Sequence, residues 1–180
     1  MTQPLIAGIL SDTHLTEPDD HFRRLVEICF AEAEVILHAG DLTDLSVLEV
    51  FDDRTVHAVR GNMCRPSACQ RLPDRKIVTL GRFKIGLIHR AGWSYDFEDQ
   101  LLPEFDEMVD CIVYGHTHRP VCHQSGGVLY INPGSFQATG RHGACGTYAL
   151  LTIGDELLAR IHHVPRLAPR MPDQGCRISR

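Results

Sequence analysis

The fold is indicated by a stretch near the N-terminus, LIAGILSDTH at residues 5–14, in which an uncharged, mainly apolar run leads into a polar turn. A short apolar run bounded by turn residues is typical of a buried strand. Asp12 and His14 follow it directly. The next segment, residues 22–33, has apolar residues at helical spacing. We therefore expect a buried strand, a polar turn and an amphipathic helix, in that order.

The same pattern of a strand followed by a polar turn occurs twice more. An apolar run at residues 35–37 leads to Asp41, and another at residues 56–59 leads to Asn62. A short helix is expected between these strands, over residues 45–51. Strands that alternate with helices indicate an α/β fold with a largely parallel sheet.

The second half of the chain is richer in strands. Residues 76–80 and 83–88 flank Gly81 and predict a hairpin. A helix is expected over residues 97–108, with Pro103 as a kink or a boundary. Further strands are expected at residues 111–114, 121–123, 128–131, 147–153 and 157–163. Two sheets packed face to face, with helices outside, would accommodate this number of strands.

Length and composition indicate a single domain. A chain of 180 residues can bury a sufficient core without disulfides. We expect the domain over residues 1–164 and an Arg- and Pro-rich tail over residues 165–180. The tail could be a poorly ordered terminus or an arm that rests on another subunit of a homo-oligomer. The net charge of -5 gives no reason to expect general nucleic-acid binding.

Cysteine usage and hydropathy bear on the compartment. The seven cysteines show no CxxC spacing, and an odd number without a secretory leader argues against a disulfide framework. No basic, cleavable leader is recognisable at the N-terminus. No apolar run approaches the roughly 20 residues that span a bilayer. We therefore expect a cytoplasmic protein with reduced thiols and no membrane partner.

Seven polar residues at the ends of predicted strands are candidate metal ligands. They are Asp12, His14, Asp41, Asn62, His89, His116 and His118. Sites in open α/β sheets form outside the carboxyl ends of strands, so we expect these residues at one edge. Their donor atoms suit Mn, Zn, Fe or Ni, and the lack of cysteine argues against a structural zinc finger. Each residue alone could be a cap, a turn residue or a solvated histidine, but their shared position favours a metal site.

The candidate ligands can be divided between two ions. One ion could be held by Asp12, His14 and His118, a second by Asn62, His89 and His116, and Asp41 could bridge them. Two ions roughly 3.5–4 Å apart can bind a bridging hydroxide and stabilise in-line attack on phosphorus.

These motifs resemble those of the calcineurin-like metallophosphoesterase superfamily, and in particular its small, YfcE-like phosphodiesterase branch. In chain order they are Asp12-Thr13-His14, Gly40-Asp41, Gly61-Asn62, His89, Gly115-His116-Thr117-His118 and Asn132-Pro133-Gly134-Ser135. The resemblance implies a four-layer α/β/β/α sandwich of two packed mixed sheets flanked by helices. It implies a phosphodiesterase with two divalent ions, Mn being favoured, whose bridging hydroxide attacks a small phosphoester. Asp41, Asn62 and His116 would then act in catalysis through the metal centre.

One departure from the family pattern follows the Gly-Asn motif. Many relatives place His or Cys there and then an acid, whereas this chain has Met63 and Cys64. A thioether cannot transfer a proton, although Cys64 could. General acid assistance is typically worth about 10²–10⁴-fold, so its loss would favour substrates with good leaving groups.

A second departure is Arg90, which follows His89 where many small relatives continue with Gly and His. A guanidinium suits bidentate contacts with phosphate, so Arg90 could contact the substrate. It could equally be a solvated surface residue.

Other functions are compatible with the same motifs. A phosphomonoesterase or a nucleotide pyrophosphohydrolase could use this metal centre, because pocket shape outside the motifs decides between them. The third alternative is a non-catalytic, Vps29-like protein-binding scaffold. Lost ligands are the usual sign of such a scaffold, and here all seven positions are filled.

Overall fold

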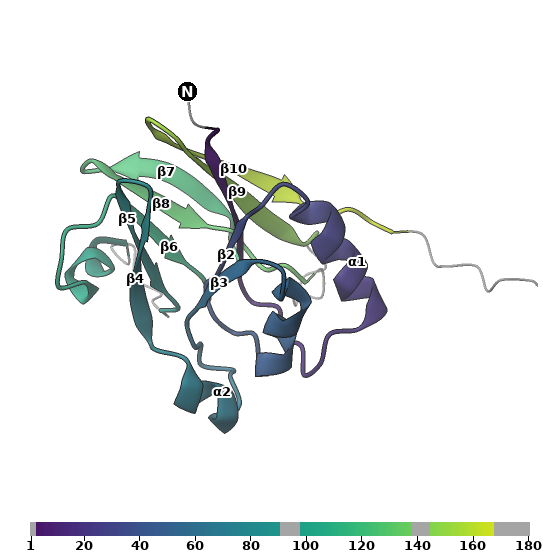
Figure 1. The fold of residues 1–180 in the computed structure, drawn as a ribbon. Coiled ribbons are helices and arrows are strands. Elements are labelled where there is room, and N and C mark those ends of the chain that lie inside the picture. Colours follow the sequence, from purple (N-terminus) through teal and green to yellow (C-terminus); the bar gives the residue numbers. More distant parts are fainter. Residues whose placement is uncertain (1–2, 91–97, 138–144, 168–180) are drawn as a thin grey trace, which may run out of the picture.

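The chain forms two five-stranded β-sheets that pack face to face (Figure 1). The computed structural model describes residues 3–90, 98–137 and 145–167. The first sheet has the strand order β10-β9-β1-β2-β3, and the second has the order β4-β5-β6-β8-β7. Both sheets contain parallel and antiparallel pairs, so the predicted sandwich of two mixed sheets is confirmed.

Strand directions bring several carboxyl ends to one end of the sandwich. The first sheet contains β1 at Leu5–Leu10, β2 at Val35–His38, β3 at Thr55–Ala58, β9 at Thr147–Ile153 and β10 at Leu157–His163. The second contains β4 at Arg75–Leu80, β5 at Phe83–Ile88, β6 at Cys111–Tyr114, β7 at Val121–Ser125 and β8 at Val128–Asn132. β1, β2 and β3 are parallel to one another, as are β5, β6 and β8. The predicted hairpin is confirmed as the antiparallel pair β4–β5.

Helices cover the outer faces of the sheets. The elements are α1 at Asp20–Cys29, the 3-10 helix η1 at Leu45–Phe51, α2 at Pro66–Arg71, and the 3-10 helices η2 at Glu98–Gln100 and η3 at Leu102–Glu104. α1 begins where the Asp19 side chain accepts a hydrogen bond from the Phe22 N–H at 2.7 Å. Its buried residues and those of η1 pack on the outer face of the first sheet.

One expectation for the helices needs correction, and one helix was not predicted. A single helix over residues 97–108 is wrong for the described part, residues 98–108, which contains only the short η2 and η3. Pro103 has no N–H and obstructs the preceding turn, so a continuous helix cannot form there. α2 was not predicted, because six residues are too few to show a helical period.

The core lies in three layers, and these explain the sequence patterns. Between the sheets, Ala7 and Ile9 of β1 meet residues of the second sheet such as Leu87 and Val113. Outside the first sheet, Leu10 of β1 packs with α1 and η1. β1 therefore reads as a continuous apolar run because both of its faces are covered.

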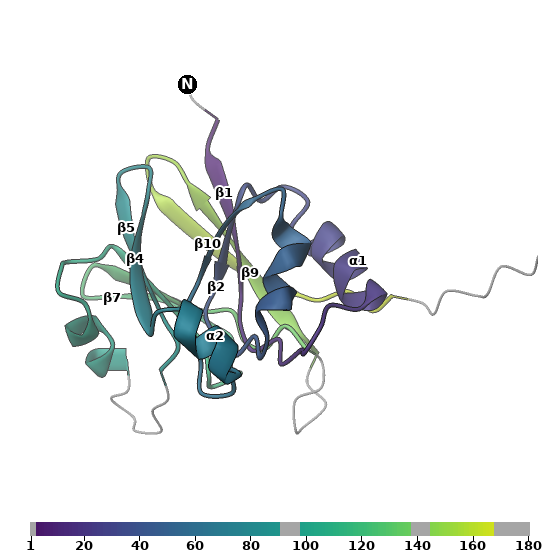
Figure 2. The same cartoon turned by 60° about the horizontal axis from the view of Figure 1, so that its bottom comes forward.

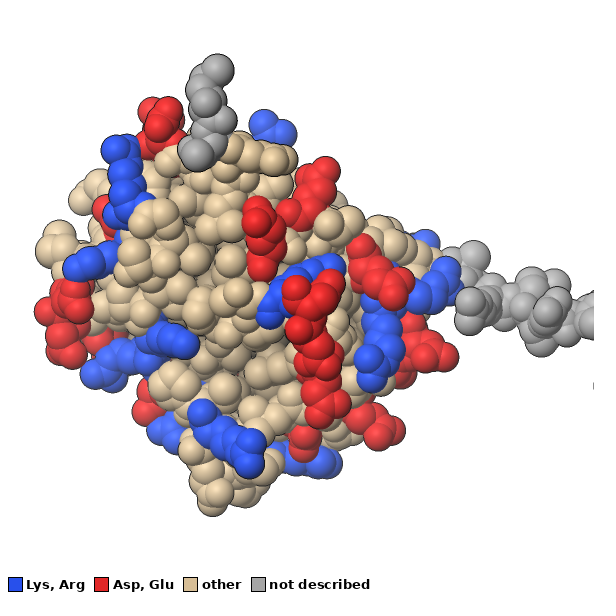
Figure 3. Space-filling view, in the orientation of Figure 1, with Lys and Arg blue, Asp and Glu red and all other residues tan. Residues whose placement is uncertain are grey.

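The outer surface carries mixed charge. On the face shown in Figure 3, Lys and Arg side chains are interspersed with Asp and Glu. Within the described ranges, no helix is long and apolar enough to cross a membrane. The predicted tail at residues 165–180 falls mainly outside those ranges, which end at residue 167.

Candidate metal centre

The seven candidate ligands stand just beyond the ends of β1, β2, β3, β5 and β6. Figure 2 turns this end of the sandwich toward the viewer. The side chains form two clusters, each with ligand atoms within 4.8 Å of one another. The first cluster contains Asp12, His14 and His118, and the second contains Asp41, His89 and His116. Each cluster therefore takes residues from both sheets.

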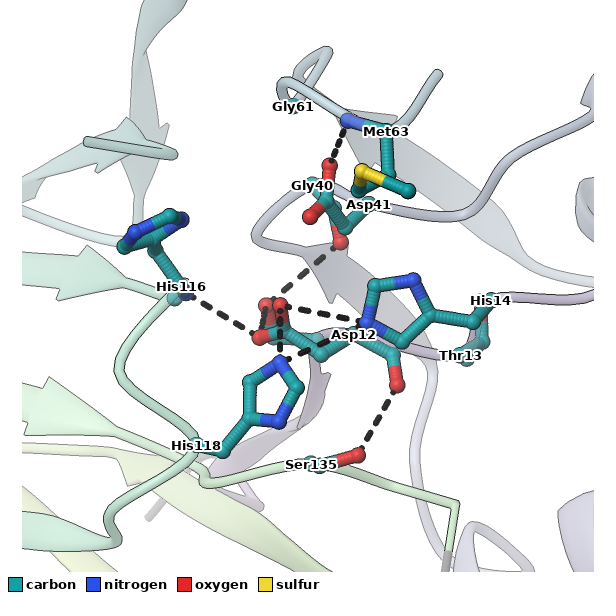
Figure 4. A network of polar contacts seen from close by, with 12 residues as sticks. Asp12, Thr13, His14, Gly40, Asp41, Gly61, Met63, His116, His118 and Ser135 are labelled. Atoms are coloured by element: carbon teal, nitrogen blue, oxygen red, sulfur yellow. Dashed lines mark hydrogen bonds and ion pairs between the residues drawn. The ribbon is translucent and has the colours of Figure 1, made fainter. Parts of the chain in front are cut away.

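In the first cluster, one oxygen of Asp12 faces two imidazoles (Figure 4). Asp12 Oδ1 lies 3.1 Å from His118 Nε2 and 3.8 Å from His14 Nε2, and these two nitrogens are 3.4 Å apart. Asp12 Oδ2 instead accepts hydrogen bonds from the Ser11 hydroxyl and the His116 N–H. Asp12 Oδ2 is thus held by hydrogen bonds within the protein, and Asp12 Oδ1 is directed toward the two histidines.

In the second cluster, a buried ring nitrogen has no hydrogen bond. His89 Nδ1 is 2.7 Å from the Ala39 carbonyl, so Nδ1 carries a proton, and in the neutral imidazole Nε2 carries a lone pair. Nε2 is buried, and among the described residues it makes no hydrogen bond, although Asp41 Oδ2 lies 3.2 Å away. Two lone pairs at this distance repel each other unless a proton or a metal cation lies between them, and a divalent ion fits here.

Asn62 belongs with this second cluster. Its side-chain oxygen lies 2.9 Å from His116 Nδ1. The predicted grouping of Asn62, His89 and His116 thus matches residues that the fold brings together, with Asp41 beside them. Amide oxygen, carboxylate and imidazole together suit a borderline or hard divalent ion.

The backbone at the candidate ligands is strained. Among the described non-glycine residues, six have positive φ: Asp12 (55°), His14 (50°), Asp41 (51°), Thr43 (71°), His116 (71°) and His118 (55°). Five of these six are candidate ligands. L-residues avoid this region because Cβ crowds the carbonyl oxygen, and such conformations cluster at functional sites.

Two glycines allow the strand ends to approach closely. A Cβ added at Gly61 would lie 2.1 Å from Asp41 Oδ1, and one added at Gly115 would lie 2.1 Å from Ser11 Oγ. Neither position can take a larger residue without moving a candidate ligand or its neighbour. The glycines that precede Asn62 and His116 are thus explained by packing.

A buried turn after β8 supports the centre from one side. The Asn132 amide donates to the Gly115 carbonyl at 3.1 Å and to the Thr117 hydroxyl at 3.0 Å. Ser135 Oγ donates to the Asp12 carbonyl at 3.0 Å. Asn132 thereby fixes the turn that carries His116 and His118.

A further supporting residue, His38, lacked any motif and was missed. It is fully buried, its Nδ1 accepts the Gly40 N–H at 3.2 Å, and its Nε2 lies 3.2 Å from Thr13 Oγ1. His38 is therefore neutral and links the turn after β1 to the turn after β2. Burial lowers its pKa to about 4. Its place at the end of a buried strand, three residues before Asp41, was the only available signal.

Charges within the clusters shift the pKa values of their members. Burial alone would raise the pKa of Asp41, but the nearby His89 imidazole and the Met63 N–H hold it below its usual range. The contact with Asp12 raises the pKa of His118. The lowered pKa favours the anionic form of Asp41, which is the form that binds a cation.

The remaining sequence candidates, Arg90, Met63 and Cys64, make other contacts. The Arg90 side chain forms an ion pair with Glu104. Met63 is 59% exposed, and its N–H donates to Asp41 Oδ1 at 2.7 Å. The Cys64 sulfur accepts a hydrogen bond from the Gly61 N–H.

The family of the chain is established by comparison with known proteins. Residues 5–156 match the model of the calcineurin-like phosphoesterase superfamily domain. The chain therefore belongs to this superfamily, and the family supports a phosphoesterase hydrolase with bound divalent metal.

Individual relatives agree with that placement. A probable metallophosphoesterase of Methanocaldococcus jannaschii is 35% identical over 135 residues, covering 73% of this chain and 68% of the relative. The structure of vacuolar protein sorting 29 from Cryptosporidium parvum is 21% identical with a TM-score of 0.75, over 91% of this chain and 93% of that one. An archaeal phosphodiesterase structure is 22% identical with a TM-score of 0.62, over 88% and 100%. At these identities the two structures show the shared fold.

Proposed function

We propose that the protein is a dinuclear-metal phosphodiesterase. The observation that carries this proposal is the buried Nε2 of His89, which has no hydrogen bond among the described residues and lies 3.2 Å from Asp41 Oδ2. In this proposal Asp12, His14 and His118 hold one ion, Asn62, His89 and His116 hold the other, and Asp41 bridges them. Mn suits the mixture of oxygen and nitrogen donors.

Two divalent ions held there would supply a hydroxide nucleophile and neutralise charge on the phosphoryl oxygens. The protein itself fixes the orientation of the residues that would hold the ions. Asp41, Asn62 and His116 stand together at the second cluster and would act in catalysis through the metal centre. The hydrogen bonds of His38, Asn132 and Ser135 fix the turns that carry them, so little reorganisation is needed on binding.

Arg90 is a candidate substrate contact within this proposal. It follows His89, and a phosphate could replace its ion pair with Glu104. An unchanged kcat/KM for a phosphodiester in Arg90→Ala would contradict this role.

The test combines metal analysis with a substrate panel. The purified protein is expected to bind two equivalents of Mn²⁺ and to hydrolyse bis-p-nitrophenyl phosphate. Asp41→Asn, which removes the proposed bridging charge, serves as the inactive control. Absence of turnover with Mn²⁺, Zn²⁺, Fe²⁺ and Ni²⁺ would refute the proposal.

Two alternatives are outcomes of the same panel. Faster hydrolysis of p-nitrophenyl phosphate or of a nucleotide pyrophosphate would indicate a phosphomonoesterase or a pyrophosphohydrolase. Metal binding without any turnover, together with a copurifying protein, would indicate a scaffold like Vps29. A cytoplasmic location and a homo-oligomer are also predictions, which fractionation and light scattering can check.

A further inference from the structure

An apolar side chain stands at the rim of the candidate metal centre. Four large apolar residues are exposed in the described part of the chain: Ile28, Met63, Met108 and Leu158. Of these, only Met63 lies in a loop that carries a candidate ligand, directly after Asn62. Figure 4 shows its side chain beside Asp41.

The loop that carries Met63 is held at several points. The Met63 N–H donates to Asp41 Oδ1 at 2.7 Å, the Gly61 N–H donates to Cys64 Sγ at 3.3 Å, and the Arg65 N–H donates to the Thr43 carbonyl at 2.9 Å. The exposure of Met63 therefore follows from its fixed position and not from a loose loop. A fixed, exposed thioether beside a polar centre is suited to contact an apolar group that arrives there.

Among the described residues, neither Met63 nor the nearby Cys64 and His38 directs a proton toward a departing group. Met63 has none to transfer. The Cys64 sulfur is turned toward the Gly61 N–H, and fully buried His38 is held between Gly40 and Thr13. In the proposed reaction, the bond from hydroxide oxygen to phosphorus forms as the bond to the leaving-group oxygen breaks. The electron pair stays on that oxygen, which later takes a proton from water.

We propose that Met63 is a specificity-determining residue that selects phosphodiesters with an aromatic, weakly basic leaving group. This inference rests on the proposed function. In-line attack places the leaving group opposite the nucleophile. A leaving group that faces solvent beside Asp41 would meet Met63, which is exposed there. The thioether packs against the aromatic ring, and the weak basicity makes protonation unnecessary.

The first test uses methyl aryl phosphate diesters with p-nitrophenyl, p-chlorophenyl and phenyl leaving groups. For the metal-loaded protein, kcat/KM is expected to fall at least about 100-fold from the p-nitrophenyl to the phenyl ester, the scale of missing general acid assistance. Met63→His, which supplies an imidazole donor, should recover about tenfold or more for the phenyl ester. A flat dependence on the leaving group would overturn the inference.

The second test separates the ring contact from the proton. Met63→Gln should raise KM for the p-nitrophenyl ester about two- to tenfold with kcat unchanged, because a sulfur–aromatic contact acts in both ground and transition states. Met63→Leu keeps an apolar side chain but lacks the sulfur, so it should raise KM less than Met63→Gln does. Met108→Gln changes a methionine that is even more exposed and lies elsewhere, and it should have no effect. Equal KM values for Met63→Gln and wild type would contradict the ring contact.

Failure of the proposed function and failure of the proposed role of Met63 would give different results. If the metal-loaded wild type hydrolyses none of these esters, the proposed function is wrong and this inference falls with it. If it hydrolyses all of them at similar rates, the proposed function stands and only the role of Met63 is wrong.

Discussion

The two clusters of the candidate centre differ in burial. In the second cluster the His89 and Asp41 side chains are 1% and 3% exposed, whereas His116 is half-buried and Asn62 is exposed. In the first, His14 and His118 are 31% and 39% exposed, although Asp12 is fully buried. Electrostatic attraction is stronger where water is excluded, so an ion at the second cluster should be held more tightly. The comparison suggests one firmly held ion and one that exchanges with solvent.

The largest expected effect comes from the buried cluster. His89→Ala should lower kcat/KM at least about 1000-fold, beyond the 10- to 100-fold typical of outer-shell partners, because it removes a ligand and leaves Asp41 without its imidazole. Metal content should fall to one equivalent or less. His14→Ala, the exposed counterpart, should retain the ion of the second cluster. Equal loss of metal in the two variants would contradict the expectation that the second cluster binds its ion more tightly than the first.

The next effect concerns pH and the support behind the buried cluster. Burial lowers the pKa of His38 to about 4, so below pH 6.5 the unfolded chain binds a proton that the folded chain does not. Stability from this group is complete above pH 6.5 and declines as the pH falls toward 4. In chelator, urea unfolding should show a loss of about 2 kcal/mol between pH 7.5 and pH 5. In His38→Gln, the free energy of unfolding should no longer fall by this amount between pH 7.5 and pH 5. If it depends on pH as in the wild type, the role of His38 is contradicted.

A smaller effect is expected from Asn132, which supports the turn shared by the two clusters. Asn132→Ala removes the hydrogen bonds to the Gly115 carbonyl and the Thr117 hydroxyl. Mn²⁺ affinity at the weaker site should fall about 10- to 100-fold in isothermal titration calorimetry. Gln124→Ala, on the exposed strand β7, is the control. If Asn132→Ala binds Mn²⁺ as tightly as the control Gln124→Ala, the turn does not need the Asn132 hydrogen bonds.

The smallest effect tests backbone strain in the exposed cluster. His118 has φ of 55°, so in chelator His118→Gly should be about 1 kcal/mol more stable than His118→Ala. At Arg119, which is not among the residues with positive φ, the same pair should show the opposite order. Chemical denaturation of the four variants checks both. The expected order at His118 depends only on the backbone, since both substitutions remove the imidazole.

Much of the site could be predicted because its signals are local. Asp12, Asp41 and Asn62 each follow an apolar run, and the runs are the buried strands β1, β2 and β3. What could not be predicted depends on partners distant in the chain. The role of His38 depends on Thr13, and the side chain of Arg90 is directed by Glu104.

The error over residues 98–108 has a different origin. Leu101, Phe105 and Val109 recur at helical spacing, and all three are buried against the second sheet. Helical spacing therefore coincides here with the side chains that face the core. The backbone is nevertheless not one helix, because Pro103 interrupts it and only the two short 3-10 helices form.

Each cluster combines residues from both sheets, and this has a mechanical consequence. Asp12 and Asp41 extend from the first sheet, and His118 and His89 extend from the second. An ion bound at either cluster would therefore act as a reversible cross-link between the two sheets. Its binding free energy would add to the resistance of the sandwich against separating at that end, in proportion to the logarithm of free metal concentration. The availability of metal in the surroundings would then set how firmly the two halves of the molecule stay together.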